Sequence, residues 1–102
     1  MIDYSDTFLK EAKQLSKKYK SFKSDLRCAV EEIQNQELGT SLGKGLYKKR
    51  VKNSSNNAGK SGGFRVIIYH IKSKKIVLMS VYSKSQKDNV SSAELQSILG
   101  SL

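Results

Sequence analysis

The run Phe64–Ile71, FRVIIYHI, is the part of the sequence that most limits the folds open to this chain. It is almost wholly apolar and rich in β-branched residues, which is typical of a central strand buried on both faces. A short turn over 72–75 follows, and the next run, KIVLMSVYS, has a similar composition. The sequence therefore predicts a β-hairpin of these two strands at the centre of a sheet.

Two helices are predicted in the first third of the chain, where apolar residues recur at steps of three and four. Ser5 is the expected N-cap of the first helix and Ser21 of the second. Ser91 and Glu94 have capping-box spacing and predict a third helix near the C-terminus. The apolar stripes of the three helices are Phe8, Ala12, Leu15, Tyr19 and Phe22; then Phe22, Leu26, Ala29, Val30 and Ile33; then Leu95, Ile98, Leu99 and Leu102.

These elements predict an α+β fold in which two N-terminal helices pack on a small antiparallel sheet of three to four strands, with a C-terminal helix. A short strand or extended arm precedes the helices, and the segments LGTSLGKG and NSSNNAGKSGG are expected to be loops. The 102 residues fit one domain over 1–102. No run approaches the roughly 20 apolar residues that span a bilayer. The first residues lack the pattern of a secretory signal, so a cytoplasmic location is expected.

The positive charge of the chain is concentrated in one half. Nineteen Lys and Arg residues against nine Asp and Glu residues give a formal net charge of +10. No acidic residue lies between Glu37 and Asp88, and that window holds twelve basic ones: Lys44, Lys48, Lys49, Arg50, Lys52, Lys60, Arg65, Lys72, Lys74, Lys75, Lys84 and Lys87. A surface that is only solvated usually mixes the two signs, so the absence of acid predicts a face that binds a polyanion.

The segment 46–52 alternates in a way that is typical of a strand. Such a strand places Lys48, Arg50 and Lys52 on one face, and Tyr47, Lys49 and Val51 on the other. Three cations at alternate positions repel one another, and a fold tolerates them more readily when an anion lies across them. In an antiparallel sheet they can converge on one patch with the side chains of Lys60, Arg65, Tyr82 and Lys84.

The other chemistry-bearing residues are expected to be structural. His70 is the only histidine, and it lies within the predicted central strand without Cys or His partners for a metal site. Cys28 lies beside core positions of the second helix and is expected to be a small buried residue. Glu31 and Glu32 are expected to be solvated, and the basic half holds no carboxylate for two-metal nuclease chemistry. No metal and no cofactor are therefore expected.

The order YKKRVK, a polar glycine loop, GKSGGFRVIIYHI and a strand ending in SVYSK resembles the RelE/HigB toxins of the RelE/ParE superfamily, most of all the HigB-like branch. The resemblance covers roughly residues 40–87 well, and helix order and chain length fit throughout. It implies a RelE-like fold and the toxin of a type II toxin–antitoxin system, a ribosome-dependent endoribonuclease that cuts mRNA and inhibits translation. The implied partners are a cognate antitoxin, the ribosome with its rRNA and the mRNA in the ribosomal A site, and no membrane.

Members of this family cut without a metal: the RNA 2′-hydroxyl attacks the adjacent phosphate while basic and tyrosine side chains move protons and neutralise charge. By motif position, the resemblance assigns the catalytic residues Lys48, Arg50, Lys52, Arg65 and Lys84. Some members carry a tyrosine shortly after the last strand. This chain has none over 87–90, and Tyr82 is the nearest candidate. The remaining basic residues of the window are predicted to bind RNA: Lys44, Lys49, Lys60, Lys72, Lys74, Lys75 and Lys87.

The chemistry of the residues agrees with these roles. The guanidinium of Arg65 can hold two phosphate oxygens at once and is the first candidate for stabilising the transition state. A lysine crowded by other cations can act as a base near neutral pH, and Lys48, Lys52 and Lys84 are the candidates. Two other functions stay open. One is ParE-like inhibition of DNA gyrase, and the other is non-catalytic nucleic-acid binding with the stacking platforms Tyr47, Tyr69 and Tyr82.

Overall fold

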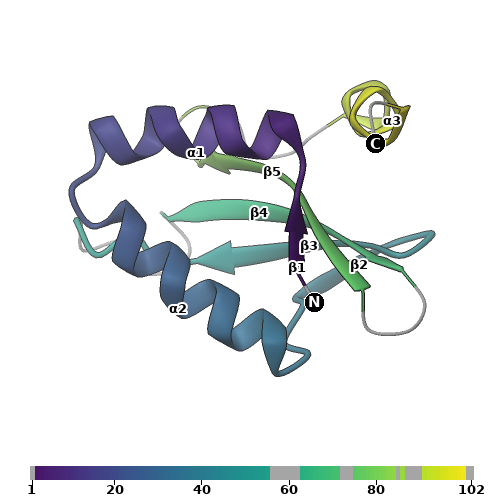
Figure 1. The fold of residues 1–102 in the computed structure, drawn as a ribbon, viewed down its shortest axis with the longest axis horizontal. Coiled ribbons are helices and arrows are strands. Elements are labelled where there is room, and N and C mark those ends of the chain that lie inside the picture. The colour runs from purple at the N-terminus through teal and green to yellow at the C-terminus, as the bar shows by residue number, and fades with distance from the viewer. Residues whose placement is uncertain (1, 56–62, 72–74, 85, 87–90, 101–102) are drawn as a thin grey trace.

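Five strands form one sheet in the described part of the chain, and helices lie against both of its faces (Figure 1). The structure is a computed structural model and describes residues 2–55, 63–71, 75–84, 86 and 91–100. The sheet has the strand order β1-β5-β4-β3-β2. Along the chain the elements are β1 (Ile2–Tyr4), α1 (Asp6–Lys18), α2 (Phe22–Gln34), β2 (Thr40–Gly43), β3 (Leu46–Val51), β4 (Phe64–Ile71), β5 (Lys75–Ser83) and α3 (Ser92–Gly100).

The predicted α+β fold is confirmed, and the hairpin of β4 and β5 lies in the middle of the sheet. The four strands β2 to β5 pair antiparallel, whereas β1 runs parallel to β5, so the sheet is mixed. It has five strands rather than three to four because Thr40–Gly43, in a segment predicted to be a loop, pairs with β3. Gly43, Lys44 and Gly45 have φ values of 86°, 56° and 83° and form the tight turn that closes this hairpin.

The two N-terminal helices cover one face of the sheet. Their buried side chains pack with those of β3, β4 and β5 into the larger core, which contains Phe8, Leu15, Phe22, Ala29, Ile33, Leu38, Val51, Phe64, Val66, Ile68, Ile76, Leu78 and Val81. Ser5 caps α1 as predicted, since its Oγ accepts a hydrogen bond from the Phe8 N–H at 3.0 Å. The side chain of Ser21 does not cap α2, because its Oγ donates to Asp25 Oδ2 at 2.8 Å instead.

The opposite face of the sheet carries a smaller core under α3. Leu95 and Leu99 of α3 pack there against the buried side chains Leu46, Ile67, Val77, Met79 and Tyr82. The predicted capping box is formed: the Glu94 N–H donates to Ser91 Oγ at 3.1 Å, and the Ser91 N–H donates to Glu94 Oε1 at 3.3 Å. Within the described ranges, no helix is long and apolar enough to cross a membrane.

Two predictions for α2 are wrong. Cys28, predicted to be buried, is exposed. The buried positions Asp25, Ala29 and Ile33 follow a four-residue spacing, which leaves Cys28 to one side of the inner stripe. Glu32, predicted to be solvated, is half-buried and forms an ion pair with Lys49 of β3, with 3.2 Å between Nζ and Oε1. A charged contact therefore joins α2 to the sheet.

Candidate nucleic-acid interface

The strand β3 divides its cations between the two faces of the sheet. Tyr47 and Val51 pack into the larger core beneath the helices, and Lys49 points the same way toward Glu32. Leu46 belongs instead to the core under α3. Because side chains alternate along a strand, Lys48 and Arg50 share one face, as predicted, and this face is the α3 side of the sheet.

A row of three side chains that the sequence predicts to be catalytic crosses the sheet on this α3 side. The residue paired with Arg50 on β4 is Arg65, and the residue paired with Arg65 on β5 is Tyr82. Tyr82 belongs to the core under α3, and directly paired residues share one face of a sheet. The structure thus brings together Arg50, Arg65 and Tyr82, which are 15 or more positions apart in sequence.

The members of this row differ in their exposure. Arg50 is exposed and Lys48, two positions before it, is half-buried. Arg65 and Tyr82 are only 2% and 1% exposed, and one Nη1 hydrogen of Arg65 is donated to the carbonyl oxygen of Phe64 at 3.2 Å. Lys84, just past the end of β5, is exposed, and its N–H donates to the Gly63 carbonyl at 3.0 Å. Cations that solvent can reach therefore flank a buried arginine and tyrosine.

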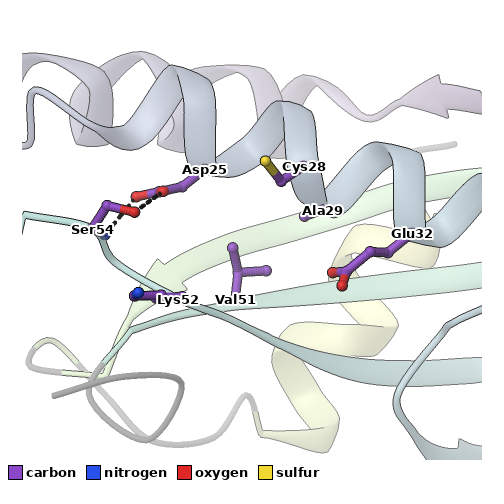
Figure 2. A pocket seen from close by; sticks show the side chains of 7 residues that line it. All are labelled: Asp25, Cys28, Ala29, Glu32, Val51, Lys52 and Ser54. Carbon is purple, nitrogen blue, oxygen red and sulfur yellow. Dashed lines mark hydrogen bonds between the residues drawn. The ribbon is translucent and has the colours of Figure 1, made fainter.

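Lys52 is not brought into this group. Since β3 ends at Val51, Lys52 lies outside the strand alternation that was expected to place it beside Arg50. It lines a cavity of about 170 Å³ together with Asp25 and Ser54 (Figure 2). Its charge acts on Asp25 of α2, so the prediction that it shares the face of Lys48 and Arg50 is wrong.

The residues predicted to bind RNA are spread more widely. Lys49 is buried against Glu32 beneath the helices, away from the row, so the structure does not place it at this interface. Lys75 is the first residue of β5, seven residues along the strand from Tyr82. Its Nζ lies 3.7 Å from Oδ2 of Asp3 on β1. Lys44 is exposed in the β2–β3 turn. Four other predicted residues lie outside the described part of the chain: Lys60, Lys72, Lys74 and Lys87.

A buried polar cluster holds the chain segment that follows β3. The carboxylate of Asp25 accepts hydrogen bonds from the Ser54 N–H at 2.8 Å and the Ser54 hydroxyl at 2.6 Å, as well as from Ser21. Asn53, 2% exposed, accepts from the Ser55 N–H at 2.9 Å, and its Oδ1 lies 3.2 Å from the Ser21 Oγ, whose hydrogen goes to the nearer Asp25. Sequence reasoning missed this cluster, although Asp25, a charge at a core position of α2, was a signal that it exists.

The environment of Asp25 lowers its pKa. Burial raises the pKa, but the hydrogen bonds from the Ser54 side chain and backbone and from Ser21, together with the charge of Lys52, outweigh burial. The usual pKa of an aspartate carboxyl is 3.8. A carboxylate whose pKa is lowered in the folded state stabilises the fold at pH values above 3.8, and this contribution is lost as pH falls through the folded-state pKa. Asp25 therefore stabilises the fold at neutral pH.

We expect Asp25→Asn to lower the free energy of unfolding at pH 7 by about 1–3 kcal/mol, because an amide cannot accept all of these hydrogen bonds. The difference from wild type should shrink as pH falls below about 3.8. Urea unfolding at several pH values measures this, with Glu31→Gln on the exposed side of α2 as the control. A difference that stays constant down to pH 2 would contradict the assigned role of the charge.

None of the three tyrosines that the sequence offered as stacking platforms is fully exposed. Tyr47 packs against the larger core, Tyr82 is buried, and Tyr69 is half-buried against the core under α3. Among the described residues, no group of three or more His, Cys, Asp or Glu side chains could hold a metal ion. The predicted catalytic side chains that the structure places on the α3 side of the sheet are those of arginine, lysine and tyrosine.

Comparisons with known proteins fit this arrangement. The model of one family, described as the RelE toxin of the RelE/RelB toxin–antitoxin system, matches residues 6–100. A solved structure of a mutant of the E. coli toxin RelE in the free state matches with a TM-score of 0.50 and 17% sequence identity, covering 99% of this chain and 90% of that chain. At this identity the structural likeness shows a shared fold alone, and no curated protein matches the sequence. The family match spans nearly the whole chain, and the chain therefore belongs to the RelE toxin family.

Proposed function

We propose that this RelE-family toxin is a HigB-like, ribosome-dependent endoribonuclease that inhibits translation by cutting mRNA. The observation that carries the proposal is the row Arg50–Arg65–Tyr82 across three strands, with Lys48 and Lys84 beside it. Four positively charged side chains gathered at one end of a sheet cost electrostatic energy, which the phosphates of a bound RNA offset. No structural need of the fold accounts for Arg50 and Lys84, which are both exposed.

The proposed reaction uses the RNA itself as the nucleophile. The 2′-hydroxyl attacks the adjacent phosphorus, a bond to phosphorus forms, the 5′-oxygen leaves, and the products are a cyclic phosphate and a 5′-hydroxyl. Arg65 and Arg50 stabilise the charge of the pentacoordinate transition state, since a guanidinium can donate to two phosphate oxygens. The base is Lys48 or Lys84, because Lys52 lies beside Asp25 instead. Tyr82 assists proton movement once the substrate has opened its buried position.

The test is cleavage on translating ribosomes. Purified protein is added to ribosomes that carry a defined mRNA, and the 5′ ends of the products are located by primer extension. We expect cuts at the A-site codon and products that end in a cyclic phosphate, because the proposed chemistry proceeds by attack of the RNA 2′-hydroxyl on the adjacent phosphorus. Intact mRNA together with inhibited gyrase supercoiling would contradict the proposal and favour ParE-like activity. Binding to ribosomes without any cut would favour a purely binding function.

A second expected result concerns salt. If about five phosphates are neutralised, the logarithm of affinity for single-stranded RNA should fall with a slope of roughly −3.5 against the logarithm of salt concentration. An increase from 50 to 200 mM salt should then weaken binding on the order of 10²-fold. Fluorescence anisotropy with a labelled RNA measures this. A nearly flat dependence would exclude the basic half of the chain as the docking surface.

We also propose that the cognate antitoxin neutralises the toxin at this interface, by bringing acidic residues to the basic half or by displacing α3. The helix α3 is only nine residues long, so few of its side chains can hold it against the sheet. Its Leu95 and Leu99 pack in the same core as Tyr82, which makes α3 part of the cover over the catalytic row. A complex in which the antitoxin touches only α1 and α2 would contradict this form of neutralisation.

A further inference from the structure

One edge of the sheet is open in the described part of the chain. The strand β2 is last in the order β1-β5-β4-β3-β2 and pairs only with β3 among the described strands. All four of its residues are exposed, including Leu42 at 44%. An edge strand offers unpaired backbone N–H and C=O groups on its outer side, to which another extended chain can add.

This edge lacks two of the features that usually protect an edge strand, a charged side chain and a proline within the strand, although it is short and irregular. The sequence of β2, TSLG, contains no charged residue and no proline. The strand is short and has one irregularity between Ser41 and Gly43. The turn between β2 and β3 is hydrogen-bonded to β4, since the His70 N–H of β4 donates to the Gly45 carbonyl at 2.8 Å. The edge is therefore held in a fixed register, ready to act as a template.

The charge beside the edge indicates what would bind there. Thr40 pairs with Lys48 and so shares its face, and Lys44 lies in the turn at the end of β2. A strand added outside β2 would run two strand spacings from β3, about 10 Å, which a glutamate and a lysine side chain can span together. A second copy of this chain fits poorly, because each copy carries a net charge of +10.

We propose that the outer edge of β2 binds an extended, acidic segment of a partner protein as a sixth strand. That this segment belongs to the antitoxin rests on the proposed function. Acidic side chains at alternate positions of the added strand would pair with Lys48 and Lys44, while its backbone forms the ladder with β2. The bound segment would place carboxylates next to the row Arg50–Arg65–Tyr82 and so compete with mRNA.

The test uses the full chain without RNA or ribosomes, so that its result is independent of cleavage. The probes are a synthetic eight-residue peptide of alternating Glu and Val, and the same peptide N-methylated at every residue. Both carry the same charge, but only the first can form a backbone ladder. In NMR titrations we expect the first peptide to shift and slow the exchange of the amides of 40–43, and the methylated one to bind at least tenfold more weakly.

A matched pair of variants tests the charge. Leu42→Glu should weaken binding of the unmethylated peptide by about tenfold through repulsion, whereas Leu42→Lys at the same exposed position should not weaken it. Equal binding of the two peptides, shifts confined to the Lys84 end of the sheet, or self-association of the chain through β2 would each overturn the proposal. A chain that fails to cut mRNA but binds the ladder-forming peptide at β2 would refute the proposed function and leave this binding site standing.

Discussion

Replacing Arg65 with lysine is expected to lower mRNA cleavage by roughly 10²-fold while RNA binding changes by only a few fold. Lysine keeps the positive charge and most of the side-chain length, but it loses the planar fork that can donate to two phosphate oxygens. A donor aimed at charge that develops in the transition state typically contributes on the order of 10²–10³ in rate. The other cations of the interface, Arg50, Lys48 and Lys84, remain to hold the RNA.

The measurement is single-turnover cleavage on ribosomes, beside a binding assay and thermal melting. Melting is needed because Arg65 is 2% exposed and donates to the Phe64 carbonyl, so its loss also affects stability. Lys17→Ala, on the exposed side of α1, is the control and should change neither rate nor binding. If cleavage and binding fall by the same factor, Arg65 contributes to RNA binding and not to stabilising the transition state. If a folded variant cuts at the wild-type rate, Arg65 is structural.

The central hairpin and the helices could be predicted because each has a clear local signal, a continuous apolar run for the strands and a helical period with a cap for the helices. Phe64–Ile71 is apolar on both faces and needs burial in any fold, and Ser5 and Ser91 mark helix starts by local hydrogen bonds. The strand β2 could not be predicted in the same way. Its four exposed residues contain no apolar alternation, and it exists because the turn at Gly43–Gly45 folds it onto β3.

The candidate site was predictable in composition and only partly in geometry. The alternation of β3 separated Lys48 and Arg50 from Lys49 correctly, but where β3 ends decides the position of Lys52, and periodicity does not show that end. Which residue on β5 lies opposite Arg65 depends on the irregularity near Ile67–Ile68, where one extra residue enters β5. Such a shift moves every following side chain to the other face, so the sequence could place Tyr82 near the patch, but its direct pairing with Arg65 follows only from the structure.

Gly63 occupies a position where the chain passes close to the end of β3. A Cβ atom there would lie against the Val51 carbonyl oxygen, far inside contact distance, and 3.0 Å from the Asn53 nitrogen. Both are backbone atoms, which cannot turn aside as a side-chain end can. The Gly63 carbonyl also accepts the hydrogen bond from the Lys84 N–H at 3.0 Å. The contact therefore joins β3, β4 and the segment after β5 at the end of the sheet that carries the row Arg50–Arg65–Tyr82, which we propose to be catalytic.

We expect Gly63→Ala to lower the free energy of unfolding by about 3 kcal/mol, because β3 and β4 must separate at this end to admit the methyl group. In a domain of this size that corresponds to a fall in Tm of roughly 10–20 °C. Gly100→Ala is the matched control, since nothing lies within 4 Å of a Cβ built there and alanine suits a helix. Calorimetry of the two variants beside wild type measures the difference. Equal melting of Gly63→Ala and wild type would show that the backbone near Val51 can move to admit the methyl group.

A large fall in Tm should be accompanied by loss of cleavage, because the spacing of Arg50, Arg65 and Lys84 depends on the same junction.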